Sequence, residues 1–160
     1  LGDVAPSRSA VGVYLRGGYA ELHAAKLSNY LVFFQGLREA AVRAFIYGEC
    51  GGYMVLGRTL TDKVGESHPM ANLLPLETSF ADAVLHLGYC HAKTTMPTPL
   101  GPKGAKFNGH EFHYCHTIKS AKSADPLFEC EDSMGKSTGR FGMVAGQIAG
   151  SLIQLIDRPK

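Results

Sequence analysis

Short apolar runs alternate with segments of helical periodicity along the first third of the chain. Residues 11–15 are β-favouring and end near two glycines, which predicts a strand and then a loop. Leucines and phenylalanines recur near helical spacing over residues 21–44, which predicts a helix. Residues 45–47 predict a second strand, and the apolar residues 52–56 predict a helix that opens directly after a turn. Because strands alternate with helices, the pattern predicts parallel strands joined by helical crossovers.

Beyond residue 57 the pattern predicts strands and loops. Residues 58–80 are polar, contain two prolines and predict an excursion from the sheet. Three later apolar segments predict further strands, at 83–89, 105–114 and 144–156. Segments rich in Lys, Ser, Pro and Gly predict loops, at 93–104 and 119–140.

Composition narrows the class of protein. The chain has 160 residues, 45% hydrophobic and 19% charged, which is typical of one globular domain with its own core. The net charge of +2 comes from scattered residues, and there is no apolar run of about 18 residues, so we expect neither a nucleic acid nor a membrane partner. Four irregularly spaced cysteines are typical of a reducing cytoplasm. The first residue is Leu1 rather than Met, which indicates a fragment or a processed product.

The candidate chemistry begins with a cysteine among glycines, in the stretch Gly48–Gly52, GECGG. A thiol becomes a nucleophile when a turn presents it and nearby donors stabilise its thiolate. Small residues around Cys50 permit a sharp strand-to-helix turn, so the pattern predicts a nucleophile elbow. The alternative interpretation is a buried thiol beside a packing turn. Glu49 either supports the elbow or is an exposed carboxylate at a helix start.

Two further stretches contain groups that could bind a ligand or take part in catalysis. Gly17 and Gly18 follow the first predicted strand, where they form either an oxyanion hole or a plain turn. The later stretch GHEFHY spans Gly109–Tyr114. Strand alternation places alternate residues of this stretch on opposite faces: His110, Phe112 and Tyr114 on one, Glu111, His113 and Cys115 on the other. Hydrogen bonding within a sheet would also explain these histidines.

A zinc site is a further interpretation of the histidines and cysteines. Its candidate ligands are Cys90, His91, His113, Cys115 and His116. No C-x-x-C pair supports it, so we assign no metal site.

Three stretches carry a resemblance to a known family: Val13–His23 (VYLRGGYAELH), Tyr47–Gly57 (YGECGGYMVLG) and Gly109–Tyr114. In this order they resemble the glutamine amidotransferase domain of the cobyrinic (hydrogenobyrinic) acid a,c-diamide synthases, over about residues 11–158. The resemblance implies the three-layer, flavodoxin-like α/β fold of class I glutamine amidotransferases, with a mostly parallel sheet and helical crossovers. It also implies that residues 1–160 are a partial domain, without the family's first strands and without its N-terminal ATP-using synthetase domain.

By this resemblance, Cys50 attacks the side-chain amide of glutamine and releases ammonia, leaving a glutamyl thioester for water to hydrolyse. Backbone amides around Gly18 and Gly51, beside Gly17 and Gly52, would hold the oxyanion. Ammonia would pass to the synthetase domain or chain, where the a and c carboxylates of the corrin-ring acid are amidated. ATP and magnesium belong to that domain, and no cofactor is implied for this one.

The chain carries only the end of a phosphate-binding loop. Gly135-Lys136-Ser137 matches the end of G-x-x-x-x-G-K-S, but Cys130 stands at the first glycine. We interpret residues 134–140 as a flexible loop.

Departures from the family's pattern bear on activity. Gln154, in the stretch GSLIQLI, stands where the family has its catalytic histidine, and a neutral amide cannot take a proton from a thiol. Arg16 replaces a proline of the glycine loop. His110 and His113 are candidates to substitute for the missing base, and Glu111 is a candidate orienter.

Two hypotheses about function follow. In the first, the domain hydrolyses glutamine through Cys50, with activity reduced by Gln154. In the second, it is a catalytically inactive remnant or fragment that serves as a folded binding module. The intact Cys50 and GHEFHY stretches favour the first hypothesis, whereas Gln154 and Arg16 favour the second.

Overall fold

A mostly parallel sheet forms the centre of the protein. The computed structural model describes residues 2–120 and 124–159, with the backbone alone at 119 and 120. The sheet has the strand order β1 (Gly12–Leu15), β2 (Phe45–Glu49), β12 (Ile148–Ser151) and β11 (Met143–Ala145). β1 and β12 both run parallel to β2, and only β11 is antiparallel to its neighbour. The predicted parallel arrangement is therefore confirmed for this sheet.

Helical segments connect β1 to β2, but they are shorter than predicted. The expected helix over residues 21–44 is divided into a 3-10 helix, η1 (Ala20–His23), and the α-helices α1 (Ala24–Leu27) and α2 (Leu31–Ala40). The Ser28 hydroxyl and the Asn29 side-chain amide both donate to the carbonyl of Ala25, at 2.9 and 2.8 Å. Such local side-chain bonds compete with the helical backbone pattern, so the helix stops there. The helix predicted after the turn is confirmed as α3 (Gly51–Leu56).

Three strands of a second, four-stranded sheet lie in the segment 58–80, for which the sequence predicted an excursion. Its order is β4 (Ser67–Pro69), β3 (Thr59–Thr61), β5 (Leu76–Ser79) and β8 (His116–Ser120). The polar residues of this segment alternate with buried ones, as Leu60 does between two threonines. The excursion is therefore itself built of strands.

A third, five-stranded antiparallel sheet corrects much of the loop predicted at 119–140, of which residues 121–123 lie outside the described residues and 119–120 belong to β8. Its order is β10 (Ser137–Phe141), β9 (Phe128–Asp132), β6 (His86–Thr94), β7 (Lys106–His113) and β13 (Gln154–Asp157). In β9 buried Phe128 and Cys130 alternate with glutamates, a period-2 signal hidden by the high charge of the segment. The turn to β10 is held by Asp132, whose carboxylate accepts the amides of Met134 and Lys136. The loop interpretation of 134–140 is thus wrong from residue 137.

The segment 144–156, predicted as one strand, contributes to two sheets. It contains the end of β11 and the whole of β12, both in the central sheet, and then most of β13, which pairs with β7 in the five-stranded sheet. Gly146 has a positive φ of 60° in the turn between β11 and β12. After β12 the chain leaves the central sheet for the five-stranded sheet, and this places Gln154 beside β7.

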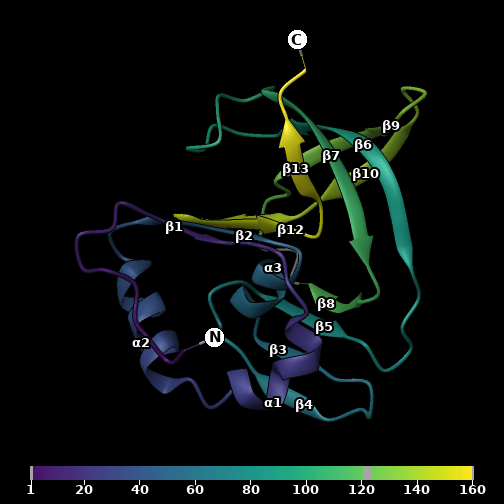
Figure 1. Ribbon diagram of the computed structural model, residues 1–160. Coiled ribbons are helices and arrows are strands. Elements are labelled where there is room, and N and C mark those ends of the chain that lie inside the picture. Colours follow the sequence, from purple (N-terminus) through teal and green to yellow (C-terminus); the bar gives the residue numbers. More distant parts are fainter. Residues whose placement is uncertain (1, 121–123, 160) are drawn as a thin grey trace.

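The central sheet lies between two apolar cores. Ile46 points into a core shared with α2 and α3, and its neighbour Tyr47 points into a core shared with the five-stranded sheet. Figure 1 shows α2 and α3 on one side of β1, β2 and β12, and β6, β7 and β13 on the other. The three-layer architecture is confirmed, with an antiparallel sheet as the third layer.

β1 forms one edge of the central sheet. The absence of earlier strands and of a synthetase domain stays a prediction. Within the described part of the chain, no helix has the length and hydropathy needed to cross a membrane.

Candidate active site

Cys50 lies at a strained turn between β2 and α3. Its φ is 48° and its ψ is −112°, a conformation that is costly for a residue with a Cβ atom. The backbone amide of Cys50 donates to the carbonyl of Ser151 on β12 at 2.8 Å, and its carbonyl accepts the amide of Met54 at 3.1 Å. The neighbouring strand and the first turn of α3 therefore hold the strained residue. The predicted strand–turn–helix geometry is present.

Gly48 and Gly52 are required because other backbone atoms approach them too closely to leave room for a Cβ atom. A Cβ atom on Gly52 would lie 2.6 Å from the carbonyl carbon of Leu15, and one on Gly48 would lie 2.8 Å from the backbone of Gly52. Real Cβ atoms do not come this close to backbone, so both positions exclude any side chain. The G-x-C-x-G spacing thus lets α3 start directly against the end of β1.

A small cavity opens beside the thiol. It has a volume of about 180 Å³. The residues that line it come from the glycine loop, η1, the elbow and α3, the end of β5, the end of β7 and the start of β13: Gly18, Tyr19, Glu21, Cys50, Met54, Phe80, Phe112, His113, Tyr114 and Gln154. The thiol of Cys50 lies 3.8 Å from the carbonyl oxygen of Phe112, to which it can donate. Cys50 is only 6% exposed, so this cavity is the open space next to its sulfur.

Gln154 reaches the thiol from the far end of the sequence. It begins β13 and pairs with His110 of β7. A Cβ atom on Gly17 would lie 3.3 Å from the amide nitrogen of Gln154 and 3.4 Å from Cβ of Cys50, so these three residues converge. The structure therefore brings together two residues, 50 and 154, that the sequence separates by about a hundred positions.

The thiol of Cys50 is kept protonated by its surroundings. Burial raises its pKa, and the charges of Glu21 and Glu49 add to the rise. Hydrogen bonds from the side chain of Gln154 and the backbone amide of Gly51 act in the opposite direction and leave a net rise. Gln154 thus stabilises a thiolate by donation but has no basic atom to create one. The Gly51 bond also places that amide next to the sulfur, where an oxyanion hole is predicted.

The GHEFHY stretch divides between the cavity and the surface of the five-stranded sheet. His113 and Tyr114 line the cavity, whereas His110 is half-buried with its ring 6.4 Å from that of Tyr89. Glu111 lies 3.6 Å from Nε2 of His113. The described contacts of Glu111 therefore connect it to His113 and do not connect it to Gln154.

Glu49 is a buried carboxylate whose place the sequence left open. It is 6% exposed and accepts hydrogen bonds from the hydroxyls of Tyr14 and Tyr47, at 2.5 and 3.0 Å. The amide of Leu155 also donates to it, at 3.2 Å. Burial is the largest cause that raises the pKa of Tyr14 to about 12, and the hydrogen bond with Glu49 is the next largest. The interpretation as an exposed carboxylate is wrong, because Glu49 ties β1, β2 and β13 together behind the elbow.

The candidate zinc ligands do not converge. His91 bonds to Asn108, and Cys115 contacts His113 at 3.7 Å, but no three of the five residues form a group in the described chain.

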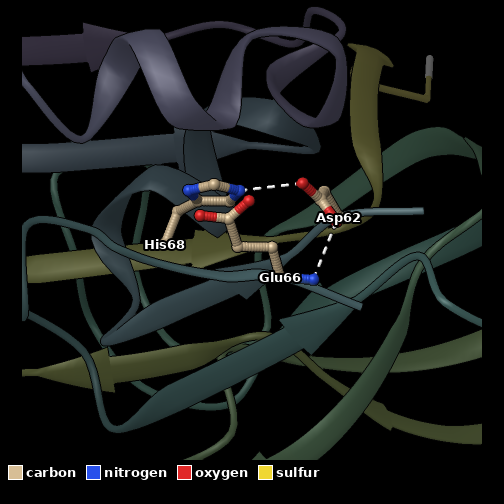
Figure 2. Close-up of side chains that lie close together, drawn as sticks. All are labelled: Asp62, Glu66 and His68. Carbon is tan, nitrogen blue, oxygen red and sulfur yellow. Dashed lines mark hydrogen bonds and ion pairs between the residues drawn. The ribbon is translucent and has the colours of Figure 1, made fainter. Parts of the chain in front are cut away.

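The described residues that do group are Asp62, Glu66 and His68, on the hairpin of β3 and β4 (Figure 2). Nε2 of His68 lies 2.9 Å from Asp62, whose second oxygen accepts the amides of Val64 and Glu66. These hydrogen bonds connect the two strands and the turn of the hairpin, and we call the group of Asp62, Glu66 and His68 the clasp.

The clasp has a testable pH dependence. The pKa of Asp62 is lowered, first by its bond with His68, so its contribution is present above the ordinary Asp pKa of about 3.9 and is lost as the pH falls through the lowered value. We expect Asp62→Asn to lower the melting temperature at neutral pH and to lose less stability on acidification. Thermal melts between neutral and acidic pH measure this. Asp82→Asn, at an exposed carboxylate, is the matched control, and an equal acid response of both variants would contradict the clasp.

The fold and the site together define a class of protein. A cysteine at a strained elbow that ends a central parallel strand, next to a small cavity, is the arrangement of enzymes that use a cysteine nucleophile. Solved structures agree on the fold: the chain matches a glutamine amidotransferase of Thermotoga maritima (TM-score 0.58, 17% identity, 93% of this chain and 57% of that one). It also matches a structure of PurLQS from Thermotoga maritima (TM-score 0.62, 14% identity, 92% and 70%).

Sequence comparison identifies the family. Residues 3–155 match the model of the CobB/CobQ-like glutamine amidotransferase domain, and the chain belongs to that family. It is 46% identical over 158 residues to a hydrogenobyrinate a,c-diamide synthase of Brucella anthropi, covering 98% of this chain and 35% of the relative. A relative of the same name from Rhodobacter capsulatus is 43% identical over 156 residues, with 98% and 35% covered. The chain thus spans about a third of the length of these relatives.

Proposed function

We propose that this chain is the glutamine-hydrolysing part of an enzyme that amidates the a and c carboxylates of hydrogenobyrinate or a related corrin-ring acid. The observation that carries the proposal is the elbow of Cys50 at the mouth of a small cavity. The names of the relatives support the choice of substrate. The cavity itself, at about 180 Å³, is below the roughly 300–1,000 Å³ of sites for drug-sized ligands, so it fits glutamine and excludes a corrin ring.

The chemistry follows from the atoms around Cys50. Its sulfur attacks the side-chain carbonyl carbon of glutamine after losing its proton, and the oxygen becomes an oxyanion. Amides near Gly18 and Gly51 would stabilise that charge. The carbon–nitrogen bond then breaks, the nitrogen takes a proton and leaves as ammonia, and a thioester remains. Water hydrolyses the thioester to glutamate and restores the thiol.

The ammonia is used outside this chain. We infer that an ATP-using synthetase module activates each carboxylate and that ammonia displaces the activated oxygen. ATP and magnesium would be bound by that module, and no residue here is assigned to them. A cytoplasmic location also stays a prediction.

The second candidate function is a folded binding module without turnover. The observation that favours it is Gln154, which occupies the space beside the thiol and cannot act as a base. In that case the cavity would bind glutamine, but Cys50 would remain a thiol.

Ammonia release from L-glutamine tests the proposal. We expect a slow rate for the unchanged chain and none for Cys50→Ala, because the sulfur forms the only covalent bond to the substrate. Cys130→Ala, at a buried cysteine of the five-stranded sheet away from the cavity, is the matched control and should retain the rate. A rate that survives in Cys50→Ala would sink the proposed nucleophile, and a folded chain without any release would favour the binding module.

A further inference from the structure

The cavity beside Cys50 contains two side chains of opposite charge type. Among the described residues that line it, Glu21 has a carboxylate side chain and His113 has an imidazole. The other lining groups are apolar, phenolic or amide groups, apart from the thiol itself. A cavity with one potential anion and one potential cation matches a ligand that carries both charges.

Glu21 is a half-buried carboxylate without a side-chain partner. No described residue makes an ion pair with it within 4.0 Å, and no described side chain donates a hydrogen bond to it. Burial raises its pKa, while a hydrogen bond with its own backbone and the charges of Lys63 and His23 act in the opposite direction. Its charge in turn raises the pKa of both Cys50 and Cys115, so the carboxylate lies on the thiol side of η1. An ammonium group in the cavity would supply a donor that no described side chain provides.

His113 has a buried nitrogen that nothing satisfies. The side chain is 5% exposed, and Nδ1 lies 3.1 Å from the carbonyl oxygen of Cys115. Because a carbonyl only accepts, Nδ1 carries the proton, and Nε2 is left buried with no hydrogen-bond partner. Glu111 lies 3.6 Å from Nε2, beyond bonding distance, and the ring of His86 stacks at 4.8 Å. An unpaired buried polar atom is costly, so a ligand is the expected partner.

We propose that Glu21 and His113 hold the α-ammonium and the α-carboxylate of free glutamine. The ammonium donates to the carboxylate of Glu21, and the α-carboxylate accepts from an Nε2–H of His113. With its head held in this way, the substrate directs its side-chain amide toward Cys50. This assignment rests on the proposed function and restricts the site to a free amino acid.

Binding of three ligands to Cys50→Ala tests the assignment without turnover. The ligands are L-glutamine, 4-carbamoylbutanoate, which lacks the α-ammonium, and 4-aminobutanamide, which lacks the α-carboxylate. A charge-assisted hydrogen bond contributes about 1.5–3 kcal/mol, so calorimetry should give dissociation constants for each analogue that are roughly 10- to 100-fold weaker than for glutamine. This first comparison needs no substitution at Glu21 or His113.

Substitutions then connect each charge to its residue. In the Cys50→Ala background, Glu21→Gln should weaken glutamine roughly 10- to 100-fold and leave 4-carbamoylbutanoate unchanged. His113→Gln should weaken glutamine similarly and leave 4-aminobutanamide unchanged. Glu77→Gln, at a half-buried carboxylate on β5, and His91→Gln, at an exposed histidine, are the controls and should bind all three ligands as before.

The outcomes separate this assignment from the proposed function. Equal weakening of all three ligands by Glu21→Gln or His113→Gln, in proteins whose thermal melts show them folded, would overturn the clamp. His113→Asn serves where His113→Gln does not fold. Ammonia release from glutamine with analogue affinities equal to that of glutamine would keep the function and remove the clamp. The expected analogue pattern without ammonia release would keep the clamp and remove the hydrolysis.

Discussion

Replacing Gln154 with histidine should raise the rate of ammonia release from glutamine by roughly 10²–10⁴-fold, the usual contribution of a positioned general base. The side chain of Gln154 lies beside Cys50 and lines the same cavity, so an imidazole at this position starts near the proton that must move. Burial keeps the thiol protonated in the unchanged chain, which is why a base is the missing element. Steady-state ammonia release at saturating glutamine measures the gain.

The pH profile distinguishes a new base from a structural change. An imidazole that accepts the proton must be neutral, so the rate of Gln154→His should rise with pH through the histidine range, near about 6.5. Gln147→His, at an exposed position before β12, is the matched control and should change neither the rate nor its pH dependence. If Gln154→His folds, binds glutamine and stays as slow as the unchanged chain, then the base at position 154 does not limit the reaction.

The second large effect should come from Gly52→Ala. The added Cβ would lie 2.6 Å from the carbonyl carbon of Leu15, and backbone cannot move aside as a flexible side chain can. Overpacking of this kind costs about 3 kcal/mol, so we expect a lower free energy of unfolding together with a displaced elbow. Urea unfolding measures the first quantity, and the rate of Cys50 alkylation by iodoacetamide measures the second.

Gly88→Ala provides the control for that substitution. A Cβ atom on Gly88 of β6 would have no neighbour within 4 Å, so the same chemical change should leave stability unchanged or slightly higher. Two variants of equal stability would mean that α3 can move away from β1, and the close approach would then not be what positions Cys50.

Gln154 matters for the chemistry of the site because its side chain lies beside Cys50. A glutamine far from the elbow would be a neutral difference between relatives, but this one lies against Cys50 and Gly17. Its side-chain amide, a donor group, partly offsets the pKa rise that burial causes at Cys50, but it offers no base to take the thiol proton. The arrangement is that of a thiol held in place at the turn without a base beside it, which is why both candidate functions require the same elbow.

Local features were predicted from the sequence because their causes are local. The spacing of Gly48, Cys50 and Gly52 is itself the requirement of a tight turn between a strand and a helix, and the structure has that turn. The parallel pairing of β1 with β2 likewise followed from alternating strands and helices. The break of the first helix had a local cause as well, since Ser28 and Asn29 bond back to Ala25, but periodicity does not register such bonds.

The tertiary structure alone decided what surrounds Cys50. Glu21, His113 and Gln154 lie on η1, β7 and β13, and no pattern within any one segment indicates that they line a single cavity. The division of residues 144–156 between two sheets brings Gln154 to β7, and the burial of Glu49 depends on the tyrosines that donate to it. Sequence patterns report the chain's own neighbours, so they determined the elbow. Contacts between distant segments form only when the sheets pack, so they determined the chemistry around it.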